Sequence, residues 1–185
     1  MPSLQKSIVI GALGFGAVSL CVFGTVAFAE RWMYMNLTVL GAYLAWTVLF
    51  IVLGGAALGS LVVGRWRLPK FYLLYGLAFF FYSVGWVVSY SASPGVAGEL
   101  IGSLAGSILM ALVFAAGFGV MKSTLKLAAL LFIGNSFGYF LGAVLNAYFG
   151  GPTGMLLWGA AYGLFLGAAI GAVLYYAQRE HGSVP

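Results

Sequence analysis

Aspartate is absent from this chain, and cysteine and histidine occur once each, as Cys21 and His181. A zinc or haem centre needs clustered histidine, cysteine or carboxylate ligands, so we expect neither group. A serine or cysteine nucleophile needs a positioned base, and His181 lies in the polar tail, outside every apolar segment. The sequence therefore predicts a protein that is not an enzyme, with no catalytic residue, no metal and no cofactor.

Charge is also scarce. Only 6% of the 185 residues are charged, whereas 63% are hydrophobic. A water-soluble domain carries about 25% charged residues, so the main solvent of this chain is lipid. The net charge is +5, but the basic residues lie between apolar segments rather than in one patch, which argues against nucleic-acid binding. The sequence therefore predicts an all-α integral membrane protein.

Six apolar stretches are long enough to cross a bilayer, whose hydrocarbon core requires about 20 residues of helix. The connections between them are short and leave no room for an extramembrane domain. We therefore expect a single transmembrane domain over residues 1–185, built as a bundle of six helices. The expected spans are residues 7–29, 37–63, 71–90, 100–121, 127–149 and 154–177.

The first span resembles a secretory signal, because Lys6 precedes an apolar run that ends in Ala27-Phe28-Ala29, an Ala-x-Ala pattern. The run is longer than the usual signal core of about 7–15 residues. We therefore interpret it as a transmembrane helix.

Lysine and arginine in the connections predict the orientation, since cytoplasmic loops carry an excess of both. One side of the membrane collects seven of the eight basic residues, and the other side holds only Arg31. We expect both termini to be cytoplasmic and the membrane to be a bacterial inner (plasma) membrane, although an organelle membrane would obey the same rule. The seven are Lys6, Arg65, Arg67, Lys70, Lys122, Lys126 and Arg179.

Glycines recur every fourth residue in the last three spans, and we call each such series a glycine row. A step of four residues returns to nearly the same face of an α-helix. In a bilayer such rows let helices approach closely, and we expect glycine-zipper packing of these spans in a compact cluster. The aromatic span 71–90 is expected at the edge of this cluster or in a groove that the rows leave. The rows are Gly98, Gly102 and Gly106; Gly134, Gly138 and Gly142; and Gly159, Gly163, Gly167 and Gly171.

Polar side chains within spans are the first candidates for function, because lipid offers them no partner. In the expected orientation, serine, asparagine, tyrosine and tryptophan side chains of three spans meet at a similar depth, in the outer half of the membrane. A cavity with aromatic walls and a few convergent polar groups is the usual form of a small-molecule site. The predicted ligand-binding residues are Tyr82, Trp86, Ser103, Ser107, Asn135, Tyr139 and Asn146.

These residues also have structural interpretations. Ser103 and Ser107 can hydrogen-bond to carbonyls one turn earlier in their own helix. An amide such as Asn135 can join two helices and fix their packing. Glu30 and Glu99, at the ends of spans, are expected to be solvated. Aromatic residues at the span ends can form an interfacial belt, namely Trp32, Tyr34 and Tyr90.

In size, helix number and cytoplasmic termini, the chain resembles two families, the substrate-binding subunits of energy-coupling-factor vitamin transporters and the Insig sterol sensors. In the first family a small-residue face of the first helix docks the partner, and Ala12 and Gly16 would be the matching feature here. The resemblance is one of topology over the whole chain, and it transfers no functional residue.

The sequence thus predicts a non-enzymatic, multi-pass membrane protein that binds a small or lipid-like molecule from the outer half of the bilayer, for transport. Two alternatives stay open: a structural or accessory subunit of a larger membrane complex, and a pore for a neutral solute. The expected partners are the lipid bilayer, the ligand, and other membrane subunits or further copies of the chain.

Overall fold

The computed structural model describes residues 2–63 and 67–181, which are helical almost throughout and include no strand. Five of the described helices are long and apolar enough to cross a membrane, and large apolar side chains cover the outside of the bundle. The all-helical fold expected from composition is therefore confirmed, and the length and apolar composition of these helices suit a multi-pass membrane protein. The elements are α1 (Leu4–Leu58), η1 (Gly59–Leu61), α2 (Arg67–Ala92), α3 (Val96–Phe118), η2 (Met121–Ser123), α4 (Thr124–Phe149) and α5 (Gly151–His181).

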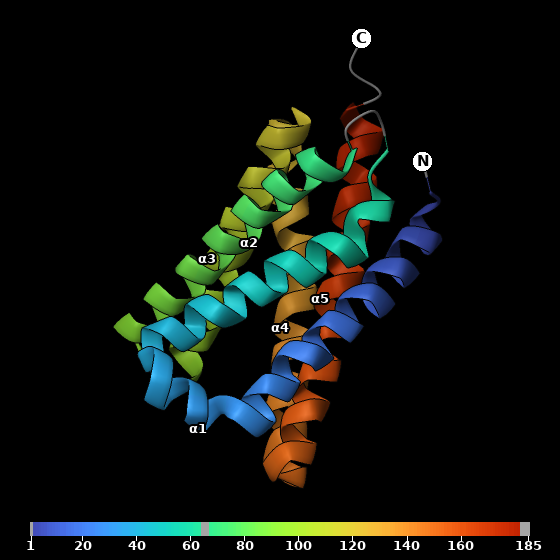
Figure 1. Ribbon diagram of the computed structural model, residues 1–185. Helices are drawn as coiled ribbons and strands as arrows, with labels where there is room; N and C mark the ends of the chain where they lie inside the picture. Colours follow the sequence, from blue (N-terminus) through green and yellow to red (C-terminus); the bar gives the residue numbers. More distant parts are fainter. Residues whose placement is uncertain (1, 64–66, 182–185) are drawn as a thin grey trace.

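Helix α1 bends back on itself at Thr38, as Figure 1 shows. Thr38 has φ 62° and ψ 170°, whereas its neighbours on both sides are helical. Its hydroxyl accepts a hydrogen bond of 3.4 Å from the backbone N–H of Gly41, in the manner of an N-cap. The bend divides α1 into a first arm, residues 4–37, and a second arm, residues 39–58, which returns toward the end of the bundle where the first arm begins.

The sequence predicts a connection between the first two spans at residues 30–36. This prediction is wrong, because the stretch is helical and belongs to the first arm. It contains neither glycine nor proline, and it is rich in residues that favour helix. The side-chain amide of Asn36 also donates to the carbonyl of Trp32 at 2.7 Å. The reversal is consequently confined to one residue instead of a loop.

We expect Thr38→Gly to stabilise the protein by about 1 kcal/mol, because the φ and ψ of Thr38 fall in a region that costs a β-branched residue roughly 1–3 kcal/mol. Part of that gain is offset by the greater freedom of glycine in the unfolded chain. Denaturant unfolding in detergent would measure the change. Thr47→Gly, a substitution inside the second arm where the backbone is helical, should destabilise instead. Equal losses for both variants would show that the bend is not strained.

The connections gather at the two ends of the bundle (Figure 1). Both termini, the start of α2 and the junction of α3 with α4 lie at one end, which we call the terminal end. The bend of α1, the α2–α3 turn and the α4–α5 turn lie at the other, which we call the distal end. The α4–α5 turn is shorter than expected, with only Gly150 between the two helices. Pro152 falls in the first turn of α5, where its missing N–H costs nothing.

Basic residues separate between these ends as the loop pattern suggested. Arg31 is at the distal end, and Arg65 lies outside the described residues. At the terminal end Lys126 pairs with Glu180 at 3.0 Å, and Gln178 donates to the carbonyl of Leu61 at 3.0 Å. Side chains of α5 therefore hold α4 and η1 against the C-terminal part of α5. The basic residues placed here are Lys6, Arg67, Lys70, Lys122, Lys126 and Arg179.

Each glycine row faces a different neighbour. The row of α5 lies against the first arm of α1, and a Cβ added to Gly167 or Gly171 would overlap backbone oxygens of that arm. The row of α4 lies against α5, where a Cβ on Gly134 would be 2.8 Å from the carbonyl oxygen of Phe165. The contacts of the other α4 and α5 glycines are Gly138 with Ala161, Gly142 with Trp158, Gly159 with Phe23, and Gly163 with Gly16 and Ser19.

The row of α3 faces α2, although α3 itself also packs against α4. A Cβ on Gly106 would lie 2.9 Å from the carbonyl oxygen of Tyr82, and one on Gly102 would lie 3.1 Å from that of Trp86. Both partners belong to the aromatic helix α2, while Gly98 packs under the α2–α3 turn at Ser93. Helix α2 thus fills the groove of α3 and is not left at the edge of the bundle.

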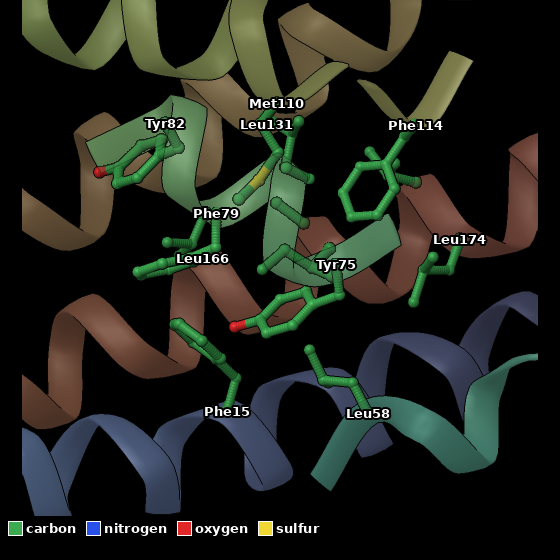
Figure 2. Packing of buried hydrophobic residues seen from close by; sticks show 14 of the residues in the cluster. Phe15, Leu58, Tyr75, Phe79, Tyr82, Met110, Phe114, Leu131, Leu166 and Leu174 are labelled. Carbon is green, nitrogen blue, oxygen red and sulfur yellow. The ribbon is translucent and has the colours of Figure 1, made fainter. Parts of the chain in front are cut away.

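Figure 2 shows the apolar core to which every helix contributes. Phe15 and Leu58 come from the two arms of α1, and Tyr75 and Phe79 come from α2. Phe79 contacts the ring of Phe50, with centroids 5.1 Å apart. These side chains are almost completely buried. The core is therefore filled toward the terminal end, and space remains toward the distal end.

Candidate functional site: an aromatic cavity at the distal end

A cavity of about 310 Å³ lies between the two arms of α1, α2, α4 and α5. Eleven of its eighteen lining residues are aromatic, and one, Glu30, is charged. Ligand sites of this kind usually measure about 300–1,000 Å³ and combine apolar walls with a few polar groups. The dimensions and lining therefore suit a small organic molecule.

The bend of α1 builds one wall of the cavity. Trp46, on the second arm, donates its indole N–H to Thr25 of the first arm at 3.0 Å. Tyr34 and Tyr43 meet the Trp46 ring edge-on, with centroids 5.9 and 5.6 Å away. Edge-on ring contacts are favourable and directional, so the three rings hold one another in place. The fold-back of α1 thus brings together aromatic residues of both arms.

Helices α2, α4 and α5 supply the facing wall. Tyr139 of α4 contacts Trp86 of α2 and Trp158 of α5, with centroid distances of 5.8 and 5.2 Å. Phe23 of the first arm continues the series to Trp158 at 6.0 Å. The indole nitrogen of Trp158 is buried and has no hydrogen-bond partner within the described part of the chain. This wall is therefore a continuous series of rings from four segments.

Among the described residues, Glu30 is the only charged one that lines the cavity. Its carboxylate accepts a hydrogen bond of 3.0 Å from the hydroxyl of Tyr34, one helical turn further along the first arm. The neighbouring Arg31 is exposed, and within residues 2–63 and 67–181 the structure holds no ion pair to Glu30. The expectation of a solvated Glu30–Arg31 pair needs correction, because Glu30 is half-buried at the cavity.

Behind the cavity, a chain of buried hydrogen bonds links four helices. The hydroxyl of Tyr162 donates to that of Tyr82 at 3.1 Å, and Tyr82 donates to Oδ1 of Asn135 at 2.7 Å. Nδ2 of Asn135 donates to Ser103 at 2.6 Å, and the Ser103 hydroxyl is 2.6 Å from that of Ser136. Tyr82 and Tyr162 also line the cavity, so this polar chain supports its inner surface.

The structure separates the seven predicted ligand-binding residues into three sets. Tyr82, Trp86 and Tyr139 line the cavity. Asn135 and Ser103 lie behind it, joined to Tyr82 through hydrogen bonds. The described partners of the Ser103 hydroxyl, Asn135 and Ser136, are both on α4 and not on its own helix.

The remaining two lie apart from the cavity. Ser107 is buried, and its hydroxyl has no hydrogen-bond partner among the described residues. Asn146 lies near the α4–α5 turn, with its amide oxygen beside Gly154. Neither residue is brought to the cavity lining.

Sequence reasoning missed most of the site, since three of the eighteen lining residues were predicted. A connection over residues 30–36 predicts that Tyr34 belongs to an interfacial belt and that Glu30 is solvated, whereas both line the cavity. The four-residue spacing of Glu30 and Tyr34 would have placed both on one helical face, had the stretch been read as helix. The other unpredicted aromatic residues of the lining include Phe23, Tyr43, Trp46, Trp158 and Tyr162.

A shallow apolar groove of about 170 Å³ adjoins the cavity on the outside of the bundle, between the second arm of α1 and α2. Exposed apolar side chains such as Leu40, Leu44 and Val88 form its sides. The groove and the cavity share four lining residues, so they adjoin along these side chains. The shared residues are Tyr43, Thr47, Ser83 and Val87.

The lining offers aromatic rings and a few polar groups to a bound molecule. Among the described residues, no group of three or more histidine, cysteine or acidic side chains could hold a metal ion. The polar groups at the cavity are a carboxylate, tyrosine and indole groups, and two small hydroxyls. Comparisons of this chain with protein-family models, with curated proteins and with solved structures found no match.

Proposed function

We propose that this chain is a six-span membrane protein that binds a small or lipid-like molecule in the aromatic cavity and serves in its transport. The observation that carries the proposal is the cavity itself, where aromatic side chains and one carboxylate converge from α1, α2, α4 and α5. Its volume of about 310 Å³ lies within the usual range of small-molecule sites.

The two arms of α1 supply the first two spans of the six. Each arm has at least the roughly 20 residues that a bilayer core requires. The basic terminal end is then cytoplasmic, by the excess of lysine and arginine there. This orientation puts the distal end, and the cavity with it, in the outer half of the bilayer. The glycine rows serve close helix packing in lipid.

The groove between the second arm and α2 gives the ligand a route from the bilayer. Its sides are apolar and face outward, where the acyl chains would lie. Thr47 and Ser83 are the smallest of the four side chains that separate groove and cavity. A molecule dissolved in the membrane would therefore enter sideways, past these residues.

The structure gives less support to the two alternative functions. The case for a structural subunit depended on glycine rows free to bind a partner, and these ten glycines lie against other parts of the same chain. The case for a pore needs a continuous path, and Phe15, Leu58, Phe71 and Tyr75 fill the bundle below the cavity. Ligand binding is the function that the described residues favour.

The test is native mass spectrometry of the protein extracted gently from its own membrane. The wild type should retain a defined small mass on the 19.5 kDa chain. Tyr139→Leu should retain at least about tenfold less, because loss of one well-placed ring contact is worth on the order of 1.4 kcal/mol. Tyr148→Leu is the matched control, since Tyr148 lies on the same helix and is 83% exposed. A wild type with no retained mass would contradict the proposal.

A further inference from the structure

The cavity holds an acidic group that a purely apolar ligand would not need. Glu30 is half-buried among aromatic rings, and its one described side-chain contact is a hydrogen bond from the neutral hydroxyl of Tyr34. A carboxylate that is partly removed from water without a basic partner is unfavourable, and a cationic ligand would supply the missing charge. Glu30 is one of only three acidic residues in the chain.

The rings beside Glu30 are the kind that bind organic cations. Tyr34, which bonds to Glu30, contacts Trp46, and Trp46 contacts Tyr43. Across the cavity lie Trp86 and Tyr139. The faces of tryptophan and tyrosine rings attract ammonium groups, and cages of such rings are a recurrent way to bind quaternary ammonium.

Charge at the distal end also favours a cation. Glu99 lies in the first turn of α3, at the distal end. Two of the three glutamates are therefore at this end, whereas Arg31 is the only basic residue that the described part of the chain places there, and it is exposed and does not line the cavity. The lysines that could repel a cation are at the terminal end.

We propose that the ligand of this site is a monovalent organic cation with an apolar substituent, such as a quaternary ammonium compound. This inference rests on the proposed function and adds the chemical class of the ligand. The ammonium head lies between the carboxylate of Glu30 and the rings of Trp46 and Trp86. The apolar substituent extends past Thr47 and Ser83 into the groove on the outside of the bundle.

Two probes of equal shape test the assignment, phenyltrimethylammonium and its uncharged carbon isostere tert-butylbenzene. Each is titrated into the full chain in dodecyl maltoside, a detergent without an ammonium group, and tryptophan fluorescence is recorded. Three of the five tryptophans line the cavity, so ring contact with a ligand should change the signal. The wild type should bind the cation at least about tenfold more tightly than the isostere.

Glu30→Gln removes the charge and keeps the shape of the side chain. This variant should lose most of the preference for the cation and bind the isostere as the wild type does. Glu180→Gln is the matched control, because it makes the same change in net charge at the terminal end and should keep the preference. The comparison of the two probes in the wild type needs no variant, so it decides the question even if Glu30→Gln fails to fold.

The possible outcomes distinguish this inference from the function on which it rests. Equal binding of both probes, or a cation preference that survives in Glu30→Gln, would overturn the cationic assignment and leave ligand binding intact. The same holds if neither probe binds but native mass spectrometry finds a retained molecule. If neither probe binds and no mass is retained, both proposals fail.

Discussion

Alanine at Gly167 is expected to destabilise the protein by about 1–3 kcal/mol, the usual cost of adding atoms to a tightly packed interior. A Cβ at this position would overlap the carbonyl oxygen of Gly11 and lie 2.7 Å from Cβ of Phe15. The first of these atoms belongs to the backbone of α1 and cannot rotate away. The helices would have to move apart along their contact.

The effect should be large because α1 and α5 share the most extensive helix contact in the molecule. Their separation would also disturb the cavity, since Phe23 of the first arm and Trp158 of α5 contact each other in its wall. Leucine at Gly167 should therefore cost more than alanine and abolish retention of the ligand. Denaturant unfolding in detergent, followed by circular dichroism, measures the loss.

Gly24→Ala is the matched control on the first arm. A Cβ there would have its nearest described neighbour 4.0 Å away, at the side chain of Leu156. Because alanine favours helix over glycine by up to about 1 kcal/mol, this variant should be neutral or slightly stabilising. Equal losses from Gly24→Ala and Gly167→Ala would mean that the glycine rows do not mark the close contacts of the bundle.

The features that the sequence predicted are those that one segment encodes by itself. Residue type and spacing along a helix show that a span is apolar and that Gly159, Gly163, Gly167 and Gly171 share one face. They do not show which helix comes to that face. In lipid, which two helices pack together depends on their shape rather than on their hydrophobicity. The glycine row of α5 packs against α1, and the row of α3 packs against α2.

The candidate site was predicted in part for the same reason. Tyr82, Trp86 and Tyr139 were found because polar and aromatic groups inside a span are conspicuous in sequence. Glu30 and Tyr34 were missed because they reach the cavity only when residues 30–37 are helical and Thr38 reverses the chain. A bend made by one residue without glycine or proline leaves no signal that spacing could reveal.

Asn135→Leu should destabilise the protein by about 1–3 kcal/mol, the second large effect that the structure leads us to expect. Asn135 is completely buried, and it both accepts from Tyr82 and donates to Ser103. Ser103 keeps a partner in Ser136, whereas Tyr82 loses the acceptor of its hydroxyl proton. The cost therefore falls mainly on Tyr82, whose hydroxyl still accepts from Tyr162 but has lost the acceptor for its own proton in an apolar interior.

A double-mutant cycle with Tyr82→Phe isolates this contribution, because phenylalanine removes the hydroxyl that Asn135→Leu leaves without an acceptor. The double variant should lose less stability than the sum of the single variants. Asn146→Leu is the control on the same helix and should change stability by no more than about 0.5 kcal/mol, since no hydrogen bond of its side chain occurs among residues 2–63 and 67–181.

Asn135→Leu also shows whether Asn135 supports the cavity wall or contacts the ligand itself. Asn135 does not line the cavity, so the fraction of Asn135→Leu that folds should still retain the small mass that Tyr139→Leu loses. The opposite result, unchanged stability with lost retention, would mean that Asn135 binds the ligand directly. In that case the residues of the buried hydrogen-bond chain would contact the ligand and would not serve only to hold the lining residues in place.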